Sequence, residues 1–106
     1  MILMTIDHIP GRDFEVLGVV NGTVVQSKHL GRDLMAGMKT IIGGEIIGYT
    51  ELLAEARQIA TKRMVDEAVN LGADAVIGVR YGSSQVMDTA AEVFAYGTAV
   101  KTIRKK

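Results

Sequence analysis

The chain contains no cysteine, and this absence removes several kinds of chemistry at once. Disulfide bonds, thiolate metal sites and cysteine nucleophiles are excluded. An excess of charge of one sign is also lacking, because 12 lysines and arginines balance 12 aspartates and glutamates. A neutral chain is not drawn to nucleic acid or to an anionic membrane surface by its charge. We therefore expect neither as a partner.

Long apolar runs are missing as well. No window approaches the roughly 20 apolar residues that a transmembrane helix needs. The N-terminal apolar stretch is short and lacks the basic leader of a signal peptide. We therefore expect a cytoplasmic protein. Its composition is globular, with 48% hydrophobic and 23% charged residues. A length of 106 residues fits one domain, which we assign to residues 1–106.

The strand signals predict an α+β fold with a small mixed or antiparallel sheet. Asn21-Gly22 stands between two apolar segments, and both residue types tolerate the positive φ angles of a type I′ turn. This pattern predicts an N-terminal β-hairpin. A weaker strand is predicted over residues 2–6, before the hairpin. Two more strands are predicted over residues 75–81 and 92–101.

Two helices are predicted between the hairpin and the last two strands. Asp33 is the expected cap of a short helix over residues 34–42. A long helix is predicted over residues 50–71, because apolar residues recur there at a spacing of 3.6. Thr50 is its expected N-cap, and Gly72 is its expected C-terminal stop. We expect the long helix to pack on one face of the sheet.

The last two strands lack a clean polar face, which is the argument for self-assembly. Antiparallel sheets that are open to water on one side normally have such a face. Strict alternation assigns these residues to single faces: Ala75, Ile77, Val79 and Tyr81 in one strand; Glu92, Phe94, Tyr96, Thr98 and Val100 in the other. One long helix covers only one face, so a monomer would expose a large apolar surface. We expect identical subunits to bury that surface in a closed ring.

Four polar residues are candidates for ligand binding. Glu45, Tyr49, Arg57 and Arg80 would meet where the glycine loop, the start of the long helix and a strand converge. Arginine binds carboxylate or phosphate groups with two parallel hydrogen bonds. The same residues would serve equally as ion pairs between subunits. No P-loop or nucleophile-elbow motif is present, so we assign no catalytic residue.

Metal binding has weak support from the residues. His8 and His29 are the only histidines, and they do not stand at a metal-ligand spacing. Each is explained more simply as a surface or hydrogen-bonded residue. A divalent metal ion, with these two histidines as ligands, stays open as a cofactor.

Three segments resemble the YbjQ-like family of small bacterial and archaeal proteins. They are LGVVNG (residues 17–22), GGEIIGYTELLAEARQIATKRMVDEAVNLGADAVIGVRY (residues 43–81) and EVFAYGTAV (residues 92–100). The family is described as a heavy-metal-binding domain and has no established catalytic residues. The resemblance implies a small α+β subunit and a ring-shaped pentamer. The segment around His29 departs from the usual family pattern. The chain also has no cysteine, so its residues give the metal description little support.

The leading hypothesis is a homo-oligomeric binding or scaffold protein, with five copies implied by the resemblance. Small-ligand or metal sites would lie at its subunit interfaces. The first alternative is a dedicated heavy-metal-binding protein. The second is an enzyme with an active site shared between subunits, which the residues favour least.

Overall fold

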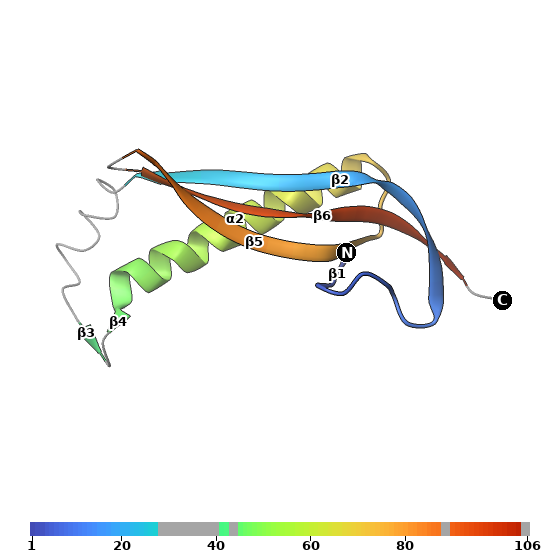
Figure 1. The fold of residues 1–106 in the computed structure, drawn as a ribbon, viewed down its shortest axis with the longest axis horizontal. Helices are drawn as coiled ribbons and strands as arrows, with labels where there is room; N and C mark the ends of the chain where they lie inside the picture. The colour runs from blue at the N-terminus through green and yellow to red at the C-terminus, as the bar shows by residue number, and fades with distance from the viewer. Residues whose placement is uncertain (28–40, 43–44, 88–89, 105–106) are drawn as a thin grey trace.

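The structure is a computed structural model that describes residues 1–27, 41–42, 45–87 and 90–104. A four-stranded mixed sheet and one long helix form its two layers (Figure 1). The strand order is β1-β5-β6-β2, with β1 parallel to β5 and the other pairs antiparallel. The elements are β1 (Ile2–Leu3), β2 (Arg12–Ser27), β3 (Ile41–Ile42), β4 (Glu45–Ile46), α2 (Ile47–Asn70), β5 (Ala75–Met87) and β6 (Ala90–Arg104). The predicted α+β class with a mixed sheet is confirmed.

The helix α2 packs against one face of the sheet through a stripe of small side chains. Every fourth residue of α2 is buried, beginning with Leu52 and continuing with Ala56, Ala60, Met64 and Ala68. A residue every four positions stays on one face of a helix. The sheet supplies the facing core residues Val20, Val24, Val76, Val79, Val93, Ala95 and Ala99. Because three members of the stripe are alanines, the helix backbone lies close to the sheet.

This close approach explains why the predicted hairpin is wrong. β2 runs without a turn from Arg12 to Ser27, and Asn21 and Gly22 pair with Tyr96 and Ala95 of β6. A Cβ atom at Gly22 would collide with the backbone of α2 at Ala60 and Met64. The glycine is therefore required by helix packing and not by a turn. Its φ angle is not positive.

The long helix is confirmed, but its start differs from the prediction. It begins at Ile47, so Thr50 lies inside the helix and is not the N-cap. Its end follows the prediction: Gly72 has a φ of 85° and donates to the carbonyl of Val69 (2.9 Å). The Ala73 N–H donates to the carbonyl of Ala68 (3.0 Å), which completes a Schellman cap.

The predicted short helix is not supported. Its residues 34–40 lie outside the described residues. Its last two positions, Ile41–Ile42, form strand β3, which pairs with β4 in a separate two-stranded sheet. Either Ile41 or Ile42 was expected on the apolar face of the short helix, yet two adjacent isoleucines also suit an extended strand.

A bulge at Gly78 reverses the faces of β5. Ile77 pairs with Thr98 and Arg80 pairs with Tyr96, so three steps along β5 match two along β6. Gly78 takes a φ of 62° at this point. The prediction that Ala75, Ile77, Val79 and Tyr81 share one face is therefore wrong: the last two point toward α2 and the first two point away. β5 also continues to Met87, beyond the predicted end at residue 81.

The N-terminal segment covers one end of the sheet face that lies away from α2. Ile9 packs there with Ala75, Ile77 and Val100 in a second, smaller core, and Met4 and Phe14 border it. The segment is anchored by backbone hydrogen bonds from Gly78 to Ile6 (2.8 Å) and from Val79 to Met4 (2.9 Å). The expectation that α2 alone provides cover within the chain is therefore corrected in part.

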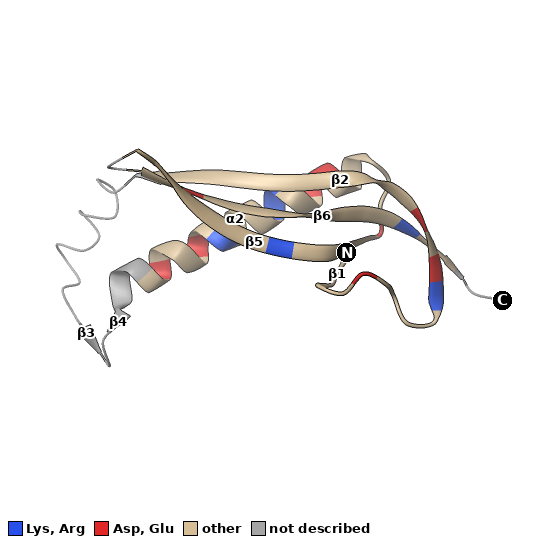
Figure 2. Cartoon of the chain, viewed as in Figure 1, with Lys and Arg blue, Asp and Glu red and all other residues tan. Residues whose placement is uncertain are grey.

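The remainder of that face has no cover from the described residues. We call it the open face and define it as Val19, Asn21, Thr23, Val25, Phe94 and Tyr96. Val19 is 73% exposed, Val25 57% and Tyr96 44%. β2 carries no charge between residues 16 and 27, and β6 carries none between residues 93 and 100 (Figure 2). The predicted ring of subunits concerns several chains and stays a prediction.

Asp74 links the end of the helical layer to β6. Its two carboxylate oxygens accept hydrogen bonds from the Thr102 N–H (2.9 Å) and the Thr102 hydroxyl (2.6 Å). The side-chain hydrogen bond from Thr102 is the main reason that the pKa of Asp74 lies below 3.8, and the Thr102 N–H lowers it further. The carboxylate therefore stabilises the folded chain most when it is ionised.

The stabilising effect of Asp74 should be lost in acid. Because the folded pKa lies below the unfolded value of 3.8, the contribution is complete above that pH and declines as the pH falls through the folded pKa. We expect Asp74→Asn to lower the urea midpoint at pH 7 and to differ less from the wild type at pH 3. An equal difference at both pH values would contradict this role.

Candidate functional site

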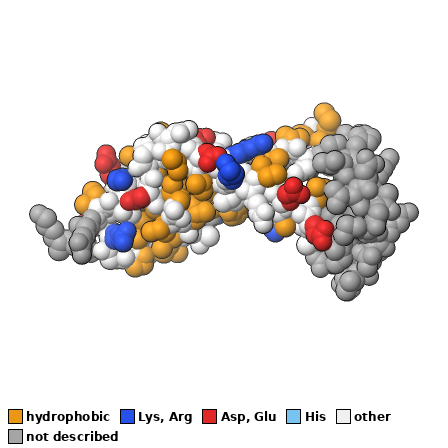
Figure 3. All heavy atoms as spheres, turned by 180° about the vertical axis from the view of Figure 1, so that it is seen from behind, with side chains coloured by type: hydrophobic (Ala, Val, Ile, Leu, Met, Phe, Trp, Pro, Cys, Tyr) orange, Lys and Arg blue, Asp and Glu red, His pale blue; other side chains and the backbone are white. Residues whose placement is uncertain are grey.

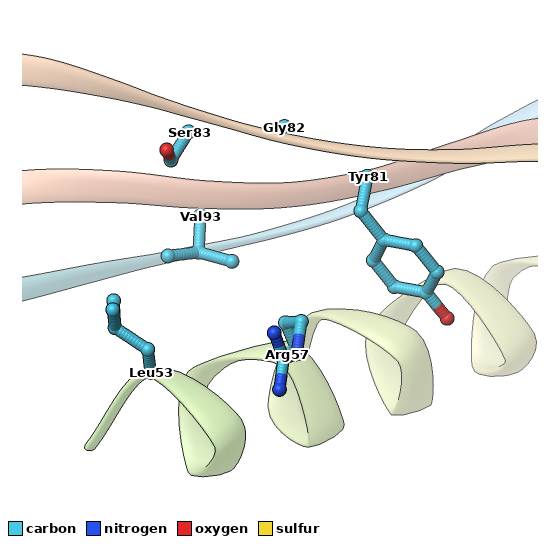
Figure 4. Close-up of a pocket in the computed structure, with 6 residues that line it drawn as sticks. All are labelled: Leu53, Arg57, Tyr81, Gly82, Ser83 and Val93. Atoms are coloured by element: carbon cyan, nitrogen blue, oxygen red, sulfur yellow. The ribbon is translucent and has the colours of Figure 1, made fainter. Parts of the chain in front are cut away.

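A pocket of about 210 Å³ lies between α2 and the middle of β5. Figure 4 shows Leu53 extending from the helix toward the strands and Tyr81 reaching down from β5 toward the helix, while the Arg57 side chain lies across the helix. Gly82 and Ser83 of β5 and Val93 of β6 complete the lining. One chain supplies every lining residue. The described lining of the pocket joins apolar walls to a single cationic side chain.

A hydrogen-bond chain holds Tyr81 in place at the edge of the pocket. The Thr61 hydroxyl donates to the carbonyl of Arg57 (2.7 Å), and the Tyr81 hydroxyl lies 2.9 Å from Thr61 Oγ1. Since Thr61 has one hydroxyl proton and gives it to the carbonyl, Tyr81 is the donor in the second bond. Arg57 and Tyr81 also line an adjoining shallow groove of about 720 Å³.

The Arg57 side chain has no ion-pair or hydrogen-bond partner among the described residues. Its helical neighbours at three and four residues are Leu53, Ala54, Ala60 and Thr61, none of which is acidic. Glu55 is two residues away and points to another side of the helix. Arg57 is therefore an exposed cation that the described part of the chain does not neutralise.

The structure separates two of the predicted ligand-binding residues. Arg57 lines the pocket on the α2 side, whereas Arg80 pairs with Tyr96 on the opposite side of the sheet. There the Arg80 Nη1 donates to the carbonyl of Thr5 (2.8 Å) and to that of Val79 (2.9 Å). Within one chain the two arginines do not form a common site. Arg80 holds the N-terminal segment, and its ligand binding stays a prediction.

The other predicted residues occupy different parts of the chain. Glu45 belongs to β4 and Tyr49 to the first turn of α2. Their side chains are not among those that the structure describes. His8 is exposed, and its Nδ1 lies 3.3 Å from the Asp7 carboxylate. His29 lies outside the described residues. Their suggested roles in ligand or metal binding stay predictions.

The sequence analysis missed the β5 side of the pocket. Gly82 and Ser83 lie beyond residue 81, where the strand was predicted to end, and Tyr81 was expected on the same face as Ala75. The usable signal was Gly78, because a glycine inside a strand often marks a bulge that reverses the faces beyond it. With that bulge, Tyr81 falls on the helix side, opposite Arg57.

The chain matches a protein-family model over residues 1–103, almost its whole length. The chain belongs to the YbjQ family. The description of that family is "Putative heavy-metal-binding". The resemblance found in the sequence is thereby confirmed.

Curated relatives of this YbjQ-family chain carry the family name UPF0145 protein. One from Vibrio campbellii is 60% identical over 97% of this chain and 100% of its own length. One from Thermotoga maritima is 64% identical over 95% of this chain and 96% of its own length. A solved structure of a protein of unknown function from Pediococcus pentosaceus has a TM-score of 0.69 and 19% identity, and covers 97% of this chain and 98% of its own. That likeness supports the fold.

The donor residues do not fit a heavy-metal site within the described part of one YbjQ chain. Heavy metals favour thiolate and imidazole ligands, and the chain has no cysteine and two histidines. Among the described residues, no group of three or more His, Cys, Asp or Glu side chains comes together. A metal site would need ligands from a second copy or from residues outside the described ones.

Among the described residues, no helix combines the length and apolar character that a membrane span requires.

Proposed function

We propose that this YbjQ-family protein is a homo-oligomeric binding protein whose copies cover one another at the open face. The uncovered apolar side chains of that face are the observation that carries the proposal. Five copies is the number that the family resemblance implies. Small-ligand sites would lie at or beside the resulting interfaces.

The composition of the open face supports burial. Val19, Val25 and Tyr96 are exposed, and the Phe94 and Tyr96 rings stack with centroids 6.0 Å apart. Aromatic side chains are enriched at the buried centre of protein interfaces, and the exposed valines would gain from removal from water there. The side of the molecule that bears α2 also shows hydrophobic side chains at the surface (Figure 3). Those side chains lie on the other side of the sheet from the open face.

A second copy of this chain suits the open face better than a charged partner does. The centre of the face has no charged side chain to steer or repel a partner (Figure 2). Arg80 borders the face, but its guanidinium already donates to two backbone carbonyls. The whole chain has a net charge of zero, so copies do not repel one another over long distances.

Two lysines on the open face should separate the copies. In Val19→Lys/Val25→Lys, association would bury unpaired charges, so we expect the dissociation constant to rise about a hundredfold or more. Analytical ultracentrifugation at micromolar concentration measures this. Val69→Lys is the matched control, since Val69 is exposed on α2. Dissociation by the control, with an intact assembly in the double variant, would place the interface elsewhere and contradict the proposal.

Heavy-metal binding is the second candidate, favoured by the description of the family. His8 and Asp7 are adjacent and exposed, so they would be available to a site completed by another copy. Calorimetric titration with zinc, copper and nickel tests this on the wild type, His8→Ala and His29→Ala. Loss of binding in either variant would support histidine ligation. Absence of binding in the wild type would end the hypothesis.

A further inference from the structure

We infer that the pocket between α2 and β5 binds a small amphiphilic carboxylate, with its carboxylate group on Arg57 and its apolar part against Leu53 and Val93. The inference deepens the proposed binding role by naming a ligand class. It rests on a pocket within one chain, so it does not require the assembly to form.

The positive charge of the lining residues favours an anionic ligand. Among the described residues, Arg57 is the one charged side chain that lines the pocket, and the adjoining groove adds Lys62. None of the described residues that line either space carries a carboxylate. Lys62 is already paired with Asp66 at 2.9 Å, whereas Arg57 has no partner among the described side chains. An arginine guanidinium binds a carboxylate through two parallel hydrogen bonds, which gives both affinity and orientation.

The walls select the apolar part of the ligand. Leu53, Val93 and the Tyr81 ring surround the space, and Gly82 contributes backbone without a side chain. The Tyr81 hydroxyl donates its one proton to Thr61, so it has none left to donate to the ligand carboxylate. The Ser83 hydroxyl is the other side-chain donor in the lining. These walls suit a short aliphatic chain or a single ring.

The size of the pocket limits the ligand further. Its volume of about 210 Å³ is below the range of about 300–1,000 Å³ that holds drug-sized ligands. A chain of about six carbons is therefore the expected scale, with an affinity for such a fragment on the order of 1 mM. The adjoining groove gives a longer ligand room to extend along α2.

The test compares three probes that differ only in their head group: hexanoate, hexanol and hexylammonium. Backbone amide NMR spectra of the full chain should shift at Arg57, Tyr81 and Ser83 with hexanoate, and little with the other two. Arg57→Gln should weaken hexanoate binding about tenfold or more, because a charge-assisted pair is lost. Arg63→Gln is the matched control on the same helix, and it should leave the affinity unchanged.

Several outcomes would overturn the inference. The first is that the wild type does not bind hexanoate. The second is that it binds hexanol as tightly as hexanoate. The third is that Arg57→Gln binds hexanoate as tightly as the wild type. Binding by the dissociated Val19→Lys/Val25→Lys variant but not by the wild type would show that another copy occupies the pocket in the assembly. Equal binding by both would support the pocket, whatever the fate of the proposed assembly.

Discussion

Gly22→Ala should lower the free energy of unfolding by about 3 kcal/mol or more, which is a large share of the about 5–15 kcal/mol that keeps a typical domain folded. The added methyl group would collide with backbone atoms of Ala60 and Met64 in α2, and it would lie 2.9 Å from the Cβ of Arg63. Backbone cannot rotate away as a flexible side chain can. The helix would have to move off the sheet, with loss of the core beneath it. Urea unfolding followed by circular dichroism measures the effect.

Asn21→Thr is the control that separates this account from the hairpin account. Asn21 is an exposed strand residue beside Gly22, so threonine should change the free energy of unfolding by no more than about 0.5 kcal/mol. A type I′ turn would need positive φ at both positions, and threonine would then be costly. A tolerated alanine at Gly22 together with a damaging threonine at Asn21 would contradict the continuous strand.

Met64→Ala should cost about 2–5 kcal/mol of unfolding free energy. Met64 is 0% exposed and is the largest fully buried side chain among the described residues. It lies at the middle of the stripe of α2 and packs into the core with Val20 and Ala95. Its alanine neighbours are too short to fill the space that it would leave. Thermal unfolding of the variant is the measurement.

Met64→Leu is the matched control for the cavity at this position. Leucine keeps most of the volume of methionine, so its cost should stay below about 1.5 kcal/mol. If the leucine and alanine variants were equally destabilised, the shape of the methionine side chain would matter more than the cavity. If both were neutral, α2 would not pack on the sheet through this stripe.

The sequence predicted the elements with strong local signals. The long helix has a periodic apolar stripe and a glycine stop, and the cap at Gly72 forms as expected. The alternation of Phe94 and Tyr96 with Val93 and Ala95 is also as expected, because β6 pairs on both sides through this stretch. In these elements, the residue pattern and the tertiary packing agree.

The errors occur where contacts distant in sequence decide the local structure. Asn21-Gly22 has the local chemistry of a turn, but the glycine serves a helix some 40 residues later. The cover provided by Ile9 depends on β1 joining the sheet beside β5, a pairing of residues more than 70 positions apart. Periodicity within a short window contains neither piece of information.

The candidate site was predicted in part for the same reason. Arg57 was identified by its residue type, since arginine is the usual carboxylate and phosphate binder. Its neighbour Tyr81 was assigned to the wrong face because the bulge at Gly78 was not foreseen. The site therefore needed the strand register, which follows from pairing between β5 and β6 and not from either strand alone.

The molar mass of the wild-type protein tests the central claim, that the open face is covered by other copies of this chain. Light scattering coupled to size exclusion, repeated over a dilution series to micromolar concentration, provides it. We expect a constant multiple of the 11.4 kDa chain mass, with five copies as the number implied by the family resemblance. A stable species of 11.4 kDa throughout the series would contradict the account.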